Sequence, residues 1–149
     1  MRAVTATLLC LAGVLPPLGN ANDEDLKKLQ GTWVLQSHLH NGKPLAANVG
    51  TTKLTIEGTK VTLTRKDKDQ TVVLKYQMAI DATKKPKAMD WVCEEGDLKG
   101  KTVLQIYHVD EGGLRIASGL ADKPRPTGFD AAAKPGSSQS FAVFKREKR

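Results

Sequence analysis

Short runs of alternating apolar and polar residues, each closed by a turn signal, restrict the folds open to this chain. Residues 71–80 carry apolar side chains at every second position, so one face of an extended strand is apolar. These side chains are Val72, Leu74, Tyr76, Met78 and Ile80. Comparable runs cover residues 32–40, 53–57, 60–65, 88–95, 101–109, 114–120 and 139–146. The pattern predicts an all-β chain of about eight strands of ordinary length.

The connections between these runs are short, and their residues favour tight turns. Asn41-Gly42 is a strong hairpin signal, and Gly58-Thr59 joins the next pair of runs. Turns of this length cannot return a chain to a parallel neighbour, so antiparallel pairing follows. One apolar face per strand fits a sheet closed into a barrel, although a two-sheet sandwich has the same period. In a barrel, Tyr76, Met78, Trp91 and Ile106 are expected to line the interior.

Two segments depart from the strand pattern. Residues 23–30 predict a short N-terminal helix with an acidic start, which Gly31 ends. Residues 121–138 form a long loop containing three prolines, and loops of this length often bind or move. Arg125 between two prolines is expected to present its guanidinium to an anion or a carbonyl group. Phe129 is expected to fold the loop back onto the core.

The N-terminus has the layout of a secretory signal peptide. Met1-Arg2 is followed by an uncharged apolar run to Leu15, and Gly19-Asn20-Ala21 supplies small residues at a cleavage site. The run is shorter than the roughly 20 residues that a permanent anchor needs, although a retained anchor is the alternative. We therefore expect residues 1–21 to be removed near Ala21, leaving residues 22–149 as one secreted or periplasmic domain without a transmembrane segment.

The remaining chain is basic. Without Arg2 it has 22 lysines and arginines against 16 acidic residues, and many of them fall in turns. Such a surface favours anionic partners, such as an envelope polymer or protein, although lysines in turns also keep β proteins soluble. Nucleic acid is not expected, because aromatic residues make up only 5% of the chain and base stacking needs them.

Catalytic and metal-binding patterns are weak. His38 and His40 share one strand face, which the alternation places opposite Trp33 and outside the core. Cys93, the one cysteine after residue 21, is in phase with Trp91 and is expected to be buried. No nucleophile elbow and no phosphate-binding glycine loop occurs. The sequence predicts a protein without catalysis, metal ion or cofactor.

A short helix running into Gly31-Thr32-Trp33 resembles the Gly-x-Trp signature of lipocalin-like barrels. The resemblance implies that Trp33 plugs one end of the barrel and that a basic side chain of the last strand, Lys145 or Arg146, packs across its ring. A wider series of segments is similar to an uncharacterised secreted domain family expanded in planctomycete bacteria. The series comprises residues 25–33 (DLKKLQGTW), 41–44 (NGKP), 85–90 (KPKAMD), 100–102 (GKT), 106–107 (IY), 125–126 (RP) with Phe129, 134–136 (KPG) and 145–147 (KRE).

This resemblance implies a lipocalin-like barrel in an exported protein and carries over no activity and no ligand residue. Together with the charge, it leads us to expect a non-catalytic binding module of the cell envelope. The alternative is a carrier that holds a small apolar ligand in the barrel interior. The two hypotheses differ in whether the basic turns or the interior does the binding.

Overall fold

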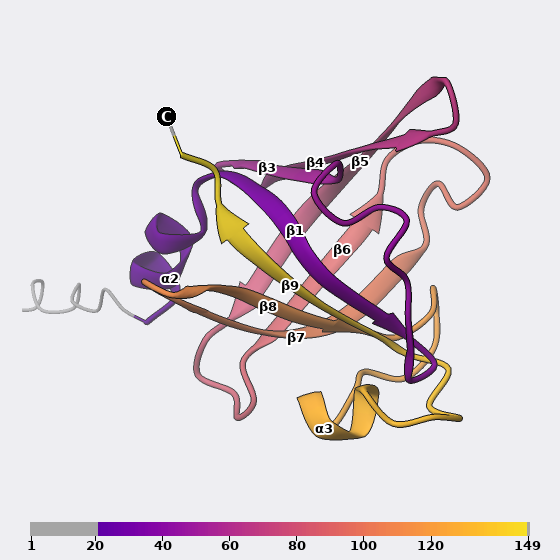
Figure 1. Ribbon diagram of the computed structural model, residues 1–149. Coiled ribbons are helices and arrows are strands. Elements are labelled where there is room, and N and C mark those ends of the chain that lie inside the picture. The colour runs from indigo at the N-terminus through magenta and orange to yellow at the C-terminus, as the bar shows by residue number, and fades with distance from the viewer. Residues whose placement is uncertain (1–20, 149) are drawn as a thin grey trace, which may run out of the picture.

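Within the barrel, strand β1 (Gly31–His40) pairs with β3 (Lys53–Glu57) on one side and with β9 (Ser140–Arg146) on the other. The other neighbours follow in chain order and every pairing is antiparallel, so the sheet closes on itself in the computed structural model (Figure 1). Between β3 and β9 lie β4 (Lys60–Asp67), β5 (Gln70–Asp81), β6 (Ala88–Cys93), β7 (Thr102–Asp110) and β8 (Gly113–Ser118). Eight strands thus form a barrel, which confirms the predicted fold and excludes the sandwich.

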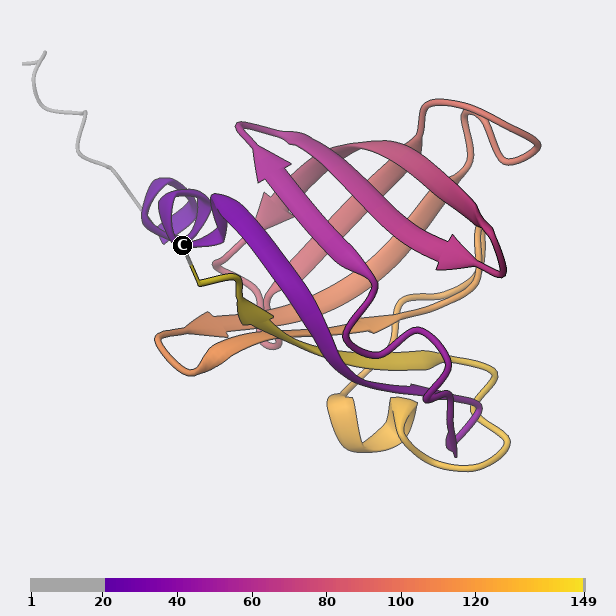
Figure 2. The same ribbon diagram turned by 45° about the horizontal axis from the view of Figure 1, so that its top comes forward.

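The structure describes residues 21–148, and the expected signal peptide lies almost wholly outside this range. Helix α2 (Ala21–Leu29) sits at one end of the barrel (Figure 2). Two small elements were not predicted: β2 (Lys43–Pro44), which extends the Asn41-Gly42 hairpin, and α3 (Phe129–Ala132) in the long loop. No helix within the described range is long and apolar enough to cross a membrane.

A β-bulge divides β1 into two halves. Leu35 pairs with Phe144 and Ser37 pairs with the next residue of β9, Val143, so β1 carries one extra residue at this point. An extra residue reverses the side-chain alternation beyond it. His38 therefore faces the interior, in register with Ala142, and the prediction that it points outward is wrong. Alternation alone could not reveal the bulge, because the bulge is visible only in the pairing with β9.

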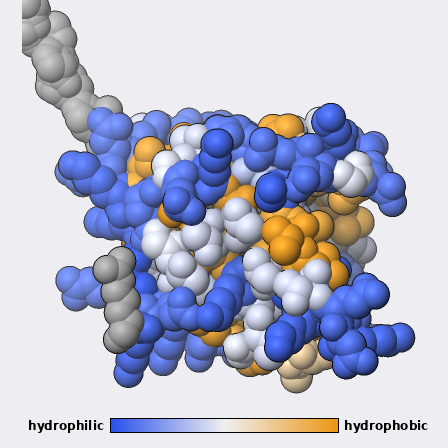
Figure 3. Space-filling view, turned by 90° about the horizontal axis from the view of Figure 1, so that it is seen from above, coloured by the Kyte–Doolittle hydropathy of each residue, from blue (hydrophilic) through white to orange (hydrophobic). Residues whose placement is uncertain are grey.

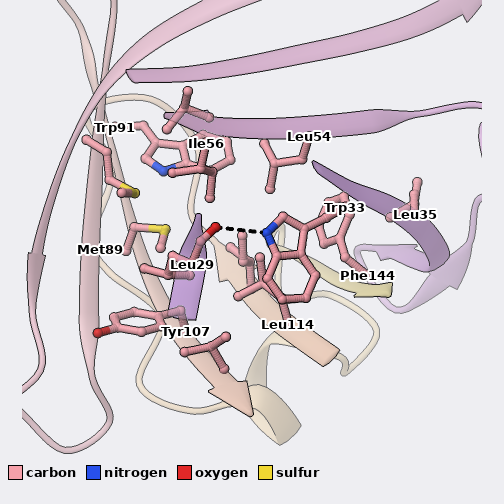
Figure 4. Close-up of a cluster of buried hydrophobic side chains, with 14 residues drawn as sticks. Leu29, Trp33, Leu35, Leu54, Ile56, Met89, Trp91, Tyr107, Leu114 and Phe144 are labelled. Carbon is pink, nitrogen blue, oxygen red and sulfur yellow. Dashed lines mark hydrogen bonds between the residues drawn. The ribbon is translucent and has the colours of Figure 1, made fainter. Parts of the chain in front are cut away.

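The base of the barrel is filled around Trp33. Its side chain is 1% exposed, and its indole Nε1 donates a hydrogen bond of 2.9 Å to the carbonyl oxygen of Leu29 at the end of α2 (Figure 4). Leu29, Leu54 and Leu114 are fully buried around it. The helix is thus attached to the core through the tryptophan that closes the barrel, and the core fills the half of the interior next to α2.

Arg146, and not Lys145, packs over this tryptophan. Its guanidinium carbon lies 4.1 Å from the centre of the Trp33 ring, and its two terminal nitrogens donate to the carbonyl oxygens of Gln30 (2.6 Å) and Lys28 (2.7 Å). These bonds satisfy carbonyl groups that the end of a helix leaves free. Gly31 has a φ of +114°, and a Cβ there would lie 2.9 Å from Arg146 Nη1. A glycine therefore lets the arginine approach.

A buried carboxylate makes a second attachment between α2 and the barrel. Asp25 is 2% exposed, and its Oδ2 accepts hydrogen bonds from Lys87 Nζ (2.7 Å) and from the Tyr107 hydroxyl (2.8 Å). Lys87 lies in the turn between β5 and β6, and Tyr107 comes from β7. Burial, followed by this carboxylate, raises the pKa of Tyr107 above its usual value. The cluster fixes the helix on the side away from β9.

The outer face of β7 and β8 is covered by α3. Ile106 packs there against Ala117 and Ala132, with Phe129 and Phe141 beside them. The expectation that Ile106 lines the interior is therefore corrected: its neighbours Gln105 and Tyr107 face inward. Because α3 gives β7 a second covered face, apolar residues occur in both phases of the strand, and the alternation does not identify the inner one.

Replacing Arg146 with alanine is expected to lower the free energy of unfolding by about 1–2 kcal/mol, through loss of the ring contact and of the hydrogen bonds to α2. Arg146→Lys should recover only part of this, since an ammonium group lacks the planar fork. Urea unfolding measures the change. Lys145→Ala, at the exposed neighbouring position, is the matched control, and an equal loss in both variants would contradict the assignment.

The raised pKa of Tyr107 predicts that the protein loses stability at alkaline pH. Its pKa is raised in the fold, so the folded state keeps a proton that the unfolded chain releases above about pH 10. Stability should be complete below that pH and decline as the pH rises further. Tyr107→Phe should cost about 1 kcal/mol at neutral pH and give a shallower alkaline decline. Urea unfolding between pH 8 and pH 11 tests this, and identical slopes would refute it.

Candidate ligand-binding cavity

The half of the barrel away from α2 contains a cavity of about 190 Å³. Its lining comes from β1, β4, β6, β7, β8 and β9 and from the segment just before β3, so it lies within the barrel. Trp91, Ile116 and Phe144 belong to both the hydrophobic core and the cavity lining. The core that fills the base therefore forms the floor of the cavity.

The apolar part of the lining is contributed by several strands. Leu63 of β4 and Ala142 of β9 join the floor residues, and Leu35 precedes the bulge in β1. Tyr76 stacks on Trp91, with ring centres 5.0 Å apart and ring planes inclined at 36°. Burial, followed by the nearby Cys93, raises the pKa of Tyr76. This stacking fixes the indole of Trp91 against the wall of the cavity.

Three residues of the lining each carry a buried polar atom that has no hydrogen-bond partner among residues 21–148: Thr52 Oγ1, Trp91 Nε1 and Gln105 Nε2. Their side chains belong to residues that are 5%, 7% and 1% exposed, respectively. Buried polar groups in native proteins are almost always paired with protein, water or ligand. Each of these three atoms has almost no accessible surface, so a water-sized molecule in the cavity does not reach it.

The backbone and side-chain contacts that hold these groups are specific. Ser118 Oγ donates to Gln105 Oε1 at 2.6 Å, which leaves the amide nitrogen of Gln105 as the free end. Thr52 is held by its own backbone, since Leu35 N–H donates to the Thr52 carbonyl oxygen (3.0 Å) and Thr52 N–H donates to that of Asn48 (3.0 Å). Asn48 also borders the cavity. These contacts hold the side chain of Gln105 and the backbone of Thr52 in place at the cavity.

His38 and Arg65 complete the lining towards the open end. Burial lowers the pKa of His38 most, and the nearby His40 and Arg65 lower it further. His38 is therefore neutral at pH 7, while His40 Nδ1 lies 3.0 Å from Ser140 Oγ. No described residue forms an ion pair or hydrogen bond with the Arg65 guanidinium, so this positive charge stands free beside the cavity.

Of the four side chains predicted to line the interior, Trp91 borders the cavity. Met78 lies in the core below it, Tyr76 lies behind Trp91, and Ile106 is outside. Sequence reasoning missed Gln105, although the sequence carries a signal for it. Gln105 is a polar residue between Val103 and Tyr107 in the inward phase of β7.

The long loop is attached to the outside of the barrel. Arg125 Nη1 donates to the carbonyl oxygens of Gln105 (2.7 Å) and Met89 (3.3 Å), and its Nη2 lies 2.7 Å from Asp90 Oδ1. The guanidinium that was expected to meet an external anion or carbonyl group thus binds carbonyl groups of the protein itself. Phe129 packs against Phe141 on the outer face.

The basic turns do not form one surface. Arg65, Lys66 and Lys68 lie near the open end, whereas Lys84 and Lys85 lie in the β5–β6 turn at the closed end. Seen from above, hydrophilic residues predominate around the edges of the molecule, with hydrophobic and intermediate residues nearer the middle (Figure 3). Two outer hollows of about 160 and 220 Å³ border Lys84.

Cys93 and the histidines were considered for catalysis or metal binding from the sequence. Cys93 is buried and its thiol donates to the carbonyl oxygen of Glu95 at 3.1 Å, so it is not presented as a nucleophile. Within residues 21–148, no group of three or more histidine, cysteine, aspartate or glutamate side chains is placed to hold a metal ion. The inward turn of His38 thus adds a polar group to the cavity without creating a metal site.

Comparison with known proteins supports the fold. The crystal structure of a lipocalin-like protein from Bacteroides uniformis ATCC 8492 superposes on this chain with a TM-score of 0.53 and 9% sequence identity. The match covers 80% of this chain and 99% of the other. Neither a protein-family model nor a curated protein matches the sequence. The barrel is lipocalin-like in fold, and this likeness says nothing further about the ligand.

The position of His38 gives a direct test of the cavity electrostatics. Its pKa should lie below the usual value of about 6.5, because of burial and the adjacent positive charge. Arg65→Gln removes that charge and should raise the pKa of His38. Arg115→Gln, on the outer face of β8, removes an equal charge elsewhere and should leave it unchanged. NMR titration of the imidazole ring measures both, and equal shifts in the two variants would contradict the placement.

Proposed function

We propose that this protein is a non-catalytic binding barrel that holds a small, largely apolar ligand in the cavity above Trp33. The observation that carries the proposal is a cavity of about 190 Å³ inside the barrel, lined by an apolar floor and by polar side chains from several strands. A barrel interior that served stability alone would be filled with apolar side chains, as the half next to α2 is. The lipocalin-like fold is compatible with this role.

The cavity volume limits the ligand. A cavity of about 150 Å³ accommodates benzene, and pockets for drug-sized compounds measure roughly 300–1,000 Å³. At about 190 Å³, this cavity suits a single ring or a short chain with a polar end. The part of the ligand that the cavity encloses is thus smaller than a long-chain lipid.

Binding through the basic turns is the weaker alternative. Charge reversal at Lys84, Lys85 and Lys87 would test it, but Lys87 already pairs with the buried Asp25. A loss of stability would therefore accompany any loss of binding at that position. The other basic turns are divided between the two ends of the barrel, so no single patch favours an anionic partner.

The proposal includes export of the protein from the cytoplasm. The leader-like residues 1–21 support secretion or a periplasmic location, and the resemblance to an exported planctomycete family points the same way. A binding barrel outside the cytoplasm would sequester or carry small molecules there. Cleavage after Ala21 would leave residues 22–29 of helix α2 at the start of the mature chain.

The cavity should bind small neutral probes. We expect benzyl alcohol and 1-hexanol to cause a saturable change in tryptophan fluorescence, because Trp91 borders the cavity while Trp33 is enclosed in the base. Ala142→Phe adds a ring to the lining and should weaken binding by about tenfold or more through steric exclusion. Val73→Phe, on the exposed face of β5, is the matched control and should bind as the wild type does.

Far-UV circular dichroism and urea unfolding would show that both variants fold. Should Ala142→Phe be too unstable, Ala142→Leu fills less of the same space and should give a smaller loss of affinity. Absence of saturable binding to the wild-type protein, or equal binding by the cavity and surface variants, would overturn the proposal.

A further inference from the structure

We infer that His38 makes ligand binding depend on pH, so that the cavity binds its ligand more tightly while the imidazole ring is neutral than when the ring is protonated; this rests on the proposed function. The bulge in β1 turns His38 into the barrel, where it borders the cavity together with Asn48 and Arg65. Among the lining residues, only His38 and Arg65 carry titratable groups. Arginine stays charged at every physiological pH, whereas histidine changes its charge between about pH 5 and pH 8.

The ring of His38 is open to an occupant of the cavity. The residue is half-buried, and no residue in the described range 21–148 forms a hydrogen bond with either ring nitrogen. Neither nitrogen is among the enclosed polar atoms without a partner, in contrast to Trp91 Nε1 and Gln105 Nε2. Both ring nitrogens therefore keep accessible surface, and polar surface of this kind is hydrated in the free protein.

The surroundings of His38 disfavour its protonated form. Burial lowers the pKa of His38 most, and His40 on the same strand and Arg65 on β4 lower it further. Lys43 of β2, the partner of His40 in the sheet, is another basic residue on this side of the ring. The lining residues from β9 and from residues 45–52 carry no titratable side chain, and no lining residue is a carboxylate. A protonated His38 thus has no negative charge on the lining to compensate it.

A ligand in the cavity makes protonation less favourable still. The ligand displaces water from the ring and replaces it with a largely apolar surface, which destabilises a charged imidazole more than a neutral one. Binding therefore lowers the pKa of His38 further. Because linkage between two binding events is reciprocal, protonation of His38 lowers the affinity for the ligand.

The sign and the pH range of the effect follow from this linkage. Above about pH 7 the ring is neutral with and without ligand, so the affinity is constant. Below about pH 6.5 the free protein takes up a proton that the complex does not, and the affinity falls by at most about tenfold for each pH unit. The fall ends at the pH where the complex is protonated as well.

Toluene and benzyl alcohol are suitable probes, since neither titrates in this range. Tryptophan fluorescence titrations at constant ionic strength should give a Kd about fivefold or more higher at pH 4.5 than at pH 7.5. Far-UV circular dichroism at each pH identifies the range in which the protein is folded, and the comparison uses the lowest pH in that range. Equal affinity across that range would overturn the inference and leave the proposed function standing. Absence of saturable binding at every pH would overturn both.

Substitutions assign the effect to one ring. His38→Gln removes the titratable group and should bind benzyl alcohol equally well at both pH values. His108→Gln, on the outer face of β7, is the matched control and should keep the full pH dependence, and His40→Gln should keep it as well. A dependence that persists in His38→Gln, or that disappears in His40→Gln, would refute the assignment to His38.

NMR titration of the imidazole rings gives a reading that needs no substitution. Saturating benzyl alcohol should lower the pKa of His38 and leave that of His108 unchanged. A merely structural role of His38 would produce no such shift, and an unchanged or raised pKa in the complex would refute the inference.

Discussion

Closure of the sheet between β1 and β9 is the constraint on which the rest of this structure depends. Because β1 pairs along its length with β9 and also with β3, no barrel strand is left with an open edge, and an interior exists. The first and last strands of the chain meet at Trp33 and Arg146, where helix α2 is attached. The base of the barrel, the position of the helix and the depth of the core all follow from this pairing.

The division of the interior into two halves has an energetic meaning. Near α2, large side chains fill the space and contribute the stability of the fold. Towards the open end, buried polar atoms remain unpaired, at a cost of about 1–3 kcal/mol for each group that finds no water. The half of the barrel near α2 thus contributes more to stability than the half near the open end.

The sequence predicted the parts of the fold that local chemistry decides. Eight strands, the N-terminal helix and the Asn41-Gly42 hairpin depend on alternation and turn residues, which are legible in a single chain. The choice of Arg146 over Lys145 at Trp33 depends on the phase of the last strand at the barrel base.

The inward turn of His38 and the outward position of Ile106 were not predictable from alternation. The first depends on a bulge opposite β9, and the second on the helix α3 that covers β7. Gln105 could have been predicted from the sequence, but the inward face of β7 was assigned to the phase of Ile106 instead of that of Gln105.

The bulge in β1 changes which residues of this strand face inward on its two sides. Before it, the inward residues serve the core, and after it, His38 and His40 turn toward the mouth while Leu39 turns out to meet Phe141. In a regular strand the same sequence would place Leu39 inside and both histidines in solvent. Loss of the extra residue would therefore turn Leu39 into the open end of the barrel and both histidines outward. In a barrel of this kind, an insertion or deletion of one residue can change the polarity of the open end as much as a substitution does.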